Sequence, residues 1–276
     1  MEKKVTVQDI LSLKGKRKIT MLTAYDHPLA SLIDRAGIDM ILVGDSVANV
    51  VLGLDSTTKV GMAEMIHHSK AVTRAVKRAL VVGDMPYESY QVNPEESVKN
   101  ARRFIEEAGC GAVKLEWFSR CLEVTGQIIK AGIPVMGHIG LTPQTADQLG
   151  GFKVQGKDAD QAKRLIDQAI ALEKLGCFAI VLECVPDKIA QMITGKIKMP
   201  TIGIGAGVYC DGQVLVTPDL LGLFERFTPK FVKKYVNLSP MISKAIEEYK
   251  REVTEGRFPD KEHSFSIKEE ELKKLN

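Results

Sequence analysis

The chain has 276 residues, 45% of them hydrophobic, and a formal net charge of +3. This length suits one large domain, and the near-neutral balance excludes a surface built mainly to bind nucleic acid. No apolar run approaches the roughly 18 residues of a membrane span, and the N-terminal segment lacks the hydrophobic stretch of a signal peptide. The five cysteines form no CxxC pair, which is typical of reduced thiols, so we expect a cytoplasmic protein without a membrane partner.

Eight short apolar segments alternate with helical ones, as in repeated βα units with buried parallel strands. A short helix over Thr6–Leu13 precedes them and would close the floor of a barrel. Eight units without a dinucleotide-binding fingerprint favour a closed (β/α)8 barrel of the TIM type over an open doubly wound sheet. The predicted strands are Thr20–Ala24, Met40–Gly44, Leu80–Asp84, Ala112–Glu116, Pro134–Ile139, Ala179–Glu183, Thr201–Ile204 and Gln213–Val216.

Helical periodicity and capping residues mark the connecting helices. Met62–Arg78 has an apolar face, Asn93 and Pro94 form a typical helix start, and Asp158–Leu175 ends at a glycine. Because no linker interrupts the pattern, we expect a single domain over residues 1–276, with a helical C-terminal extension. The helices predicted after the last strand are Asp219–Phe224, Ser239–Arg251 and a charged tail over Ser266–Leu275.

Four of the predicted strands end at a carboxylate or are followed directly by one: Asp45, Asp84, Glu116 and Glu183. The carboxyl ends of parallel strands lie at one end of a barrel, so these acids would meet there. Buried like charges need a cation or a shared proton, and oxygen ligands without a Cys or His cluster point to Mg²⁺. Each Asp is also consistent with a helix cap or turn, and Glu183 with either a general base, a further metal ligand or a network partner.

Lys114 and His138 are the other charged or titratable residues of these strands. Lys114 lies two positions before Glu116, so both side chains point to the barrel interior. A buried lysine needs an anion, which is either a substrate carboxylate or an internal partner such as Glu116 or Asp84. His138 ends the fifth predicted strand, where a hydrogen-bonded core histidine and a functional one are both consistent with the pattern.

Taken together, these segments resemble the ketopantoate hydroxymethyltransferase family over nearly the whole chain. The order and spacing of the segments carry the resemblance, since no single segment is decisive. The most specific segments are GDSVANVVLG (44–53), GDMPYESY (83–90), PVMGHIGLTPQ (134–144), VLECVP (181–186) and IGIGAG (202–207).

The resemblance implies a (β/α)8 barrel related to the phosphoenolpyruvate mutase and isocitrate lyase group. It implies that Asp45, Asp84 and Glu116 form a Mg²⁺ site, and that Ser46 and Lys114 help to hold an α-keto acid. Asp45 and Asp84 would then bind the substrate as well as the metal. It further implies a homo-oligomer, often a decamer.

In such an enzyme Glu183 is the general base, and His138 lies among the substrate-binding side chains. The implied reaction transfers a hydroxymethyl group from 5,10-methylenetetrahydrofolate to 3-methyl-2-oxobutanoate through a Mg²⁺-stabilised enolate, giving 2-dehydropantoate for pantothenate synthesis. A Mg²⁺-dependent 2-keto acid lyase or phosphonate mutase of the same group is the alternative enzyme. A barrel that has lost catalysis and serves in binding or assembly is the alternative from another class.

One segment departs from the family pattern. The family commonly has Gly-Gly after Lys-Leu-Glu, whereas Trp117 and Phe118 stand there in this chain. Two aromatic side chains in this loop are expected to change the pocket wall and to leave the charged residues in place.

Overall fold

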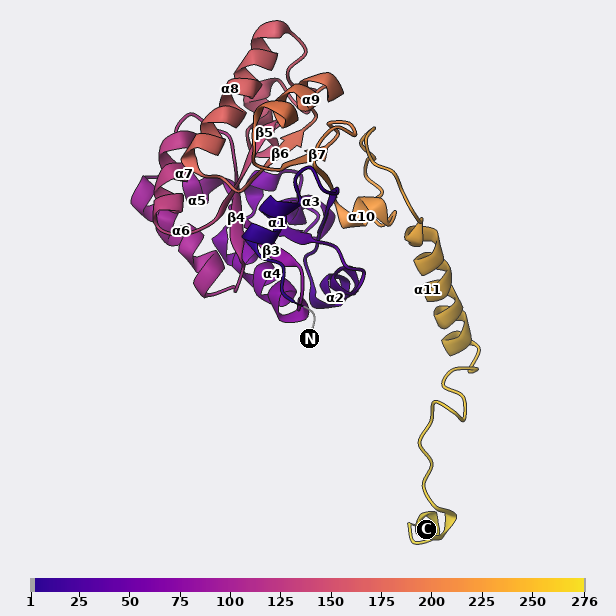
Figure 1. Cartoon of the computed structure of the whole chain (residues 1–276). Helices are drawn as coiled ribbons and strands as arrows, with labels where there is room; N and C mark the ends of the chain where they lie inside the picture. Colours follow the sequence, from indigo (N-terminus) through magenta and orange to yellow (C-terminus); the bar gives the residue numbers. More distant parts are fainter. Residues whose placement is uncertain (1–2, 276) are drawn as a thin grey trace.

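The computed structural model is a closed barrel of eight parallel strands surrounded by helices (Figure 1). It describes residues 3–275, apart from the side chains of residues 147 and 149; the ends of the expected 1–276 domain, residues 1–2 and 276, lie outside the described residues. The predicted barrel is therefore confirmed. The strands are β1 (Ile19–Thr23), β2 (Met40–Val43), β3 (Leu80–Asp84), β4 (Ala112–Glu116), β5 (Val135–Gly140), β6 (Ala179–Glu183), β7 (Thr201–Ile204) and β8 (Gly212–Leu215).

Each strand pairs with its neighbour in sequence, and β8 returns to pair with β1, which closes the barrel. Strands β1, β5 and β8 are each displaced by one residue from the predicted segments. In β5 this displacement brings Gly140 into register with Glu183 of β6. The carboxyl ends of β2 to β6, where the site lies, therefore form one continuous rim.

The core has two layers, one inside the barrel and one between the strands and the helices. The inner layer includes Ile10 of helix α1 (Val7–Leu13), which is completely buried among strand side chains such as Met21 and Met40. A reciprocal capping box fixes the start of α1, because Asp9 N–H donates to Thr6 Oγ1 and Thr6 N–H donates to Asp9 Oδ2. Helix α1 thus closes one end of the barrel, as predicted.

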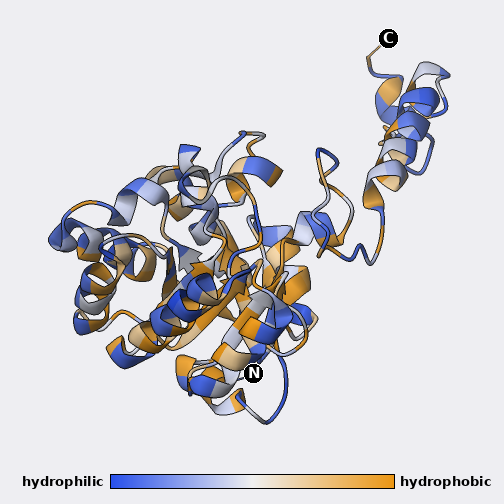
Figure 2. Cartoon of the chain, turned by 90° about the horizontal axis from the view of Figure 1, so that it is seen from above, coloured by the Kyte–Doolittle hydropathy of each residue, from blue (hydrophilic) through white to orange (hydrophobic). Residues whose placement is uncertain are grey.

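Hydrophobic strands occupy the centre and more polar helices cover them, as Figure 2 shows. Helix α4 ends at Ala75, three residues before the predicted end at Arg78, because Arg78 and its neighbours bind the buried Asp34 carboxylate through backbone N–H groups. The helices after α1 are α2 (His27–Arg35), α3 (Val47–Val50), α4 (Met62–Ala75), α5 (Tyr87–Tyr90), α6 (Pro94–Glu106), α7 (Cys121–Lys130), α8 (Ala159–Leu175) and α9 (Asp187–Lys196), with 3-10 turns at Thr57–Lys59 and Pro143–Leu149.

The C-terminal part differs most from the prediction. The helix predicted over Asp219–Phe224 is wrong: helix α10 spans Thr217–Leu220, and the chain then turns at Gly222, which has a φ of +67°. Helix α11 (Leu238–Thr254) is longer than the predicted Ser239–Arg251 and projects away from the barrel, and α12 (Glu269–Leu272) is shorter than the predicted tail helix (Figure 1). None of the helices in residues 3–275 is long and apolar enough to cross a membrane.

Candidate active site

The four predicted carboxylates lie at the same end of the barrel. Asp84, Glu116 and Glu183 are the last residues of β3, β4 and β6, and Asp45 follows β2 by two positions. Asp45, Asp84 and Glu116 are at most 6% exposed. The backbone N–H of Asp45 donates to Asp84 Oδ2 at 3.0 Å, which joins the ends of β2 and β3.

Lys114 supplies the positive charge of this cluster. Its Nζ lies 2.9 Å from Asp84 Oδ1 and 3.2 Å from His138 Nδ1, with its side chain only 4% exposed. Burial opposes the lysine charge, but Asp84 and Glu116 outweigh this effect and raise the pKa of Lys114 above its usual value. The sequence left open whether the anionic partner of Lys114 is a substrate carboxylate or an internal side chain. The structure shows an internal partner, Asp84.

His138 connects Lys114 to Glu183. The distance from His138 Nε2 to Glu183 Oε2 is 3.2 Å, and the distance from its Nδ1 to Glu116 Oε1 is 3.5 Å. Burial and the charge of Lys114 lower the pKa of His138 well below its usual value, so the imidazole is neutral. Because Nδ1 faces the lysine ammonium, it accepts a hydrogen bond there, which assigns the ring proton to Nε2. Nε2 makes no hydrogen bond to the described residues, although it lies close to Glu183.

Burial raises the pKa values of three carboxylates in this cluster. The pKa of Glu183 rises to about 8, and the charge of Lys114 opposes the shift. The pKa of Asp84 rises to about 7 for the same reason, and that of Glu116 rises well above its usual range. Without a cation these carboxyl groups therefore tend to keep their protons, because Lys114 alone does not compensate the charge of all of them in ionised form.

Two buried oxygen atoms indicate how a cation would fit. Asp84 Oδ1 and Glu116 Oε1 make no hydrogen bond to the described residues, although Asp84 Oδ1 has the ion-pair contact with Lys114. In residues 3–275, no three His, Cys, Asp or Glu side chains form a ready metal-binding group. Mg²⁺ usually needs only one or two carboxylates, with water and substrate oxygens as its other ligands. These residues are thus compatible with Mg²⁺.

Gln144, which was not predicted from the sequence, holds several of these groups in place. Its Nε2 donates to Asp45 Oδ2 at 2.8 Å and to the Met85 carbonyl at 3.1 Å, and its backbone N–H donates to Glu116 Oε2 at 3.0 Å. The Tyr90 hydroxyl donates to Gln144 Oε1. The only sequence signal for this role is a polar residue in the loop that follows a site strand.

Ser46 lies beside this cluster rather than within it. Its hydroxyl is 2.8 Å from the Tyr25 hydroxyl, and the Tyr25 side chain is buried. Ser46 immediately precedes the short helix α3, next to Asp45. The structure thus places all the predicted site residues at one end of the barrel.

The backbone around Glu183 is tightly packed. Cys184 adopts a φ of +48°, unusual for a residue with a side chain, and Gly140 in the adjacent strand has a φ of +96°. A Cβ atom at Gly140 would clash with the Glu183 carbonyl oxygen and would lie 2.7 Å from Val185 Cγ2. Only glycine permits this close approach of β5 to β6.

We expect Gly140→Ala to destabilise the protein by more than about 3 kcal/mol, since the left-handed conformation costs roughly 1–2 kcal/mol and the clash adds to it. Gly132→Ala is the matched control, because Gly132 has a φ of +81° but open space around its Cβ position. Urea unfolding of both variants separates the two effects. Equal losses of unfolding free energy would show that the packing against Glu183 contributes nothing.

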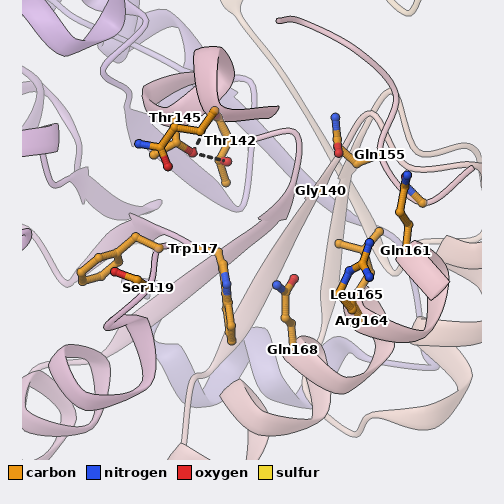
Figure 3. Close-up of a pocket in the computed structure, with 13 residues that line it drawn as sticks. Trp117, Ser119, Gly140, Thr142, Thr145, Gln155, Gln161, Arg164, Leu165 and Gln168 are labelled. Carbon is orange, nitrogen blue, oxygen red and sulfur yellow. Dashed lines mark hydrogen bonds between the residues drawn. The ribbon is translucent and has the colours of Figure 1, made fainter. Parts of the chain in front are cut away.

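Next to the charged cluster lies a pocket of about 370 Å³. Figure 3 shows Trp117 and Gln168 pointing into the same space, with Gly140 at the end of β5 behind them. Phe118 packs edge-on against Tyr90, at 5.1 Å between ring centroids, so the unusual aromatic pair is joined to the Gln144 network. The pocket is lined by Trp117, Phe118, Ser119, Gly140, Thr142, Thr145, Gln148, Gln155, Gly156, Gln161, Arg164, Leu165 and Gln168.

Comparison with known proteins gives one consistent family. Residues 4–261 match the family model described as ketopantoate hydroxymethyltransferase. The chain is 60% identical over 262 residues to 3-methyl-2-oxobutanoate hydroxymethyltransferase of Syntrophomonas wolfei, covering 95% of each chain. It is 56% identical to the protein of the same name from Syntrophobacter fumaroxidans, covering 100% of this chain and 98% of the relative.

Solved structures with similar folds are more distant in sequence. A phosphonopyruvate hydrolase in complex with oxalate and Mg²⁺ aligns with a TM-score of 0.61 at 13% identity, covering 97% of this chain and 93% of that one. A 2,3-dimethylmalate lyase of the phosphoenolpyruvate mutase and isocitrate lyase superfamily gives 0.61 at 14% identity, covering 94% and 92%. These likenesses confirm the predicted barrel fold.

Proposed function

The chain belongs to the ketopantoate hydroxymethyltransferase family, and we propose that it transfers the one-carbon unit of 5,10-methylenetetrahydrofolate to 3-methyl-2-oxobutanoate in pantothenate biosynthesis. With one water molecule consumed, the products are 2-dehydropantoate and tetrahydrofolate. The observation that carries the chemistry is a carboxylate, Glu183, that is only 15% exposed and lies 3.2 Å from a neutral histidine, which in turn contacts the ammonium group of Lys114. This arrangement suits removal of a proton next to a carbonyl group.

Each group has a role in this reaction. Lys114 attracts the carboxylate of the keto acid to the end of the barrel, and Glu183 removes the proton from C3. His138, neutral and in contact with Lys114 through Nδ1, packs its Nε2 against Glu183 and positions the base by this contact. The resulting enolate carbon attacks the methylene carbon of the folate, so that a C–C bond forms and a C–N bond to the folate breaks. Water then attacks the same methylene carbon and breaks its second C–N bond. The water oxygen becomes the hydroxyl group of 2-dehydropantoate, and the folate nitrogen takes up a proton to give tetrahydrofolate.

Asp45, Asp84 and Glu116 would hold Mg²⁺ in this site. When bound, the ion supplies a Lewis acid that polarises the keto group and compensates the excess negative charge. Gln144 keeps the Asp45 and Glu116 carboxylates in position for it. The surplus of buried carboxylates over ammonium groups supports this assignment.

The titration of these carboxylates predicts a pH-dependent effect of Mg²⁺. Because burial raises the pKa values of Asp84 and Glu183 to about 7 and about 8, the folded protein binds more protons than the unfolded chain between about pH 5 and pH 8. Metal-free stability therefore falls as pH rises through this range. Mg²⁺ binds the deprotonated groups, so we expect it to raise the melting temperature more at pH 8 than at pH 6.

Thermal unfolding in EDTA and in MgCl₂ at matched ionic strength measures this difference. The variant Asp84→Asn should show a much smaller Mg²⁺ effect at pH 8. A metal-free melting temperature that rises with pH, or a Mg²⁺ effect unchanged in the variant, would count against the assigned site.

A product assay tests the reaction itself. The protein, Mg²⁺, 5,10-methylenetetrahydrofolate and 3-methyl-2-oxobutanoate should together give 2-dehydropantoate by mass spectrometry, and omission of the folate should abolish it. A lyase or mutase of the same fold group would need no folate. Turnover of a 2-keto acid or phosphonate without folate, and no 2-dehydropantoate, would favour that alternative.

We also propose that the protein is a cytoplasmic homo-oligomer, with a decamer expected from the family resemblance. Helix α11 contains no buried residue and stands away from the barrel (Figure 1). Its exposed apolar side chains recur at helical spacing, which is typical of a helix face that packs against a partner. They are Met241, Ile242, Ile246, Tyr249 and Val253. A second copy of this chain is the expected partner.

We expect Ile246→Asp to shift the protein to a smaller species in light scattering coupled to size-exclusion chromatography. A charge in the centre of the apolar face of α11 opposes its burial. Lys244→Asp, a charge change on the polar side of the same helix, is the control and should leave the mass unchanged. A monomeric wild-type protein, or equal masses for wild type and Ile246→Asp, would contradict this proposal.

A further inference from the structure

The pocket beside the charged cluster has no part in the chemistry derived above, yet its inner wall touches the catalytic strands. Gly140 lines the pocket and packs against the Glu183 backbone. The backbone N–H of Trp117 donates to the His138 carbonyl at 2.9 Å. Its volume of about 370 Å³ lies in the range of small-molecule sites. A ligand in this pocket would therefore lie beside the ends of the strands that carry His138 and Glu183.

The polar lining of this pocket is dominated by amide side chains. Gln148, Gln155, Gln161 and Gln168 line it, and each amide offers both hydrogen-bond donors and an acceptor. Gln161 Oε1 accepts from the Gly156 N–H, and Gln155 Nε2 donates to the Lys153 carbonyl, so two of these side chains are fixed. Their other polar atoms make no hydrogen bond to the described residues. Such a lining suits an uncharged ligand edge with mixed donors and acceptors.

Charge and shape narrow the ligand class further. Arg164 is the only charged side chain in the lining, and it makes no ion pair with the described residues; no carboxylate is present. Trp117, which is partly exposed, offers an aromatic face at the same opening, and Figure 3 shows it opposite Gln168. The lining of this pocket thus contrasts with the neighbouring acidic cluster, and it favours a flat heterocycle that carries an anionic tail.

We propose that this pocket binds the reduced pterin ring of the one-carbon donor. Trp117 stacks on the ring, Gln168 and Gln161 pair with its amino, ring-nitrogen and carbonyl groups, and Arg164 meets the glutamate carboxylate. The proposal rests on the proposed function and deepens it by placing the second substrate. It also gives the Trp117-Phe118 departure a role, since the aromatic side chain forms the stacking wall.

The chain contains a single tryptophan, Trp117, so its intrinsic fluorescence reports on this pocket alone. Anaerobic titration with tetrahydrofolate should quench it, with N-acetyltryptophanamide correcting for absorption by the ligand. p-Aminobenzoylglutamate, which lacks the pterin, should quench far more weakly. Gln168→Leu should weaken tetrahydrofolate binding about tenfold, as expected for one or two lost hydrogen bonds, and should raise KM for the folate more than it lowers kcat. Lys163→Ala, an exposed change on the same helix, should bind normally.

Three results would overturn the pocket assignment: no quenching of the wild type, equal affinity in Gln168→Leu, or equal quenching by p-aminobenzoylglutamate. A second assay on the same preparation, exchange of the C3 proton of 3-methyl-2-oxobutanoate in D₂O without folate, keeps the two proposals apart. Exchange without quenching overturns the pocket assignment alone. Loss of both, in protein that also forms no 2-dehydropantoate when folate is added, overturns the proposed function with it.

Discussion

Glu183→Gln is expected to lower the rate of C3 proton removal by roughly a thousandfold, within the range that a positioned general base contributes. The amide keeps the size of the side chain and its contact with His138 but cannot accept the proton. Keto-acid binding should survive, since Lys114 and the Asp45–Asp84 pair are unchanged. Proton exchange by NMR measures the first effect, and calorimetric titration of the keto acid with Mg²⁺ measures the second.

The matched control is Glu106→Gln, an exposed glutamate at the end of α6 that should leave both measurements unchanged. Loss of Mg²⁺-dependent keto-acid binding in Glu183→Gln would contradict the assignment. In that case Glu183 would be a structural or metal-binding group, which was the alternative considered from the sequence.

Lys114→Met is expected to have the largest effect on stability. It removes the one ammonium group from a cluster in which the side chains of Asp84, Glu116 and His138 are at most 3% exposed. Breaking a buried ion pair in this way typically lowers the free energy of unfolding by about 3–5 kcal/mol. Urea unfolding in EDTA at pH 7.5 measures the loss. This pH is chosen because a carboxyl group with a pKa near 7 is then about half or more ionised.

The double variant Lys114→Met/Asp84→Asn provides the internal control, because it removes the stranded charge together with its partner. It should be more stable than Lys114→Met alone, whereas Lys130→Met on the surface of α7 should change little. If the double variant lost as much free energy of unfolding as the two single variants lose together, the Lys114–Asp84 pair would carry no coupling energy.

The barrel and its acidic end could be predicted because both depend on short, continuous segments of the sequence. Each strand is a short apolar run, and Asp84, Glu116 and Glu183 stand directly at the ends of such runs, so both position and burial could be predicted. The pairing of Lys114 with Asp84 was one of two open alternatives, because it depends on the register between β3 and β4. The sequence pattern does not determine that register.

The features that could not be predicted depend on loops and on contacts distant in sequence. Gln144 reaches Asp45, 99 positions away, from a loop whose path no periodicity describes. The amide-lined pocket combines the loop after β4 with one side of α8, so none of its residues is distinctive alone. The helix predicted over Asp219–Phe224 failed because Leu223 and Phe224 both bond back to the Pro218 carbonyl, which ends α10 early.

The proposed function depends on removal of the C3 proton of a 2-keto acid at this site, with the help of a bound divalent cation. Proton NMR of 3-methyl-2-oxobutanoate in D₂O, with the protein and Mg²⁺, tests it most directly, with EDTA and the Glu183→Gln variant as controls. We predict that the C3–H signal of the substrate disappears only with wild-type protein and metal. A signal that persists under these conditions, in protein that forms 2-dehydropantoate when folate is added, would contradict the account of Glu183 as an independent base.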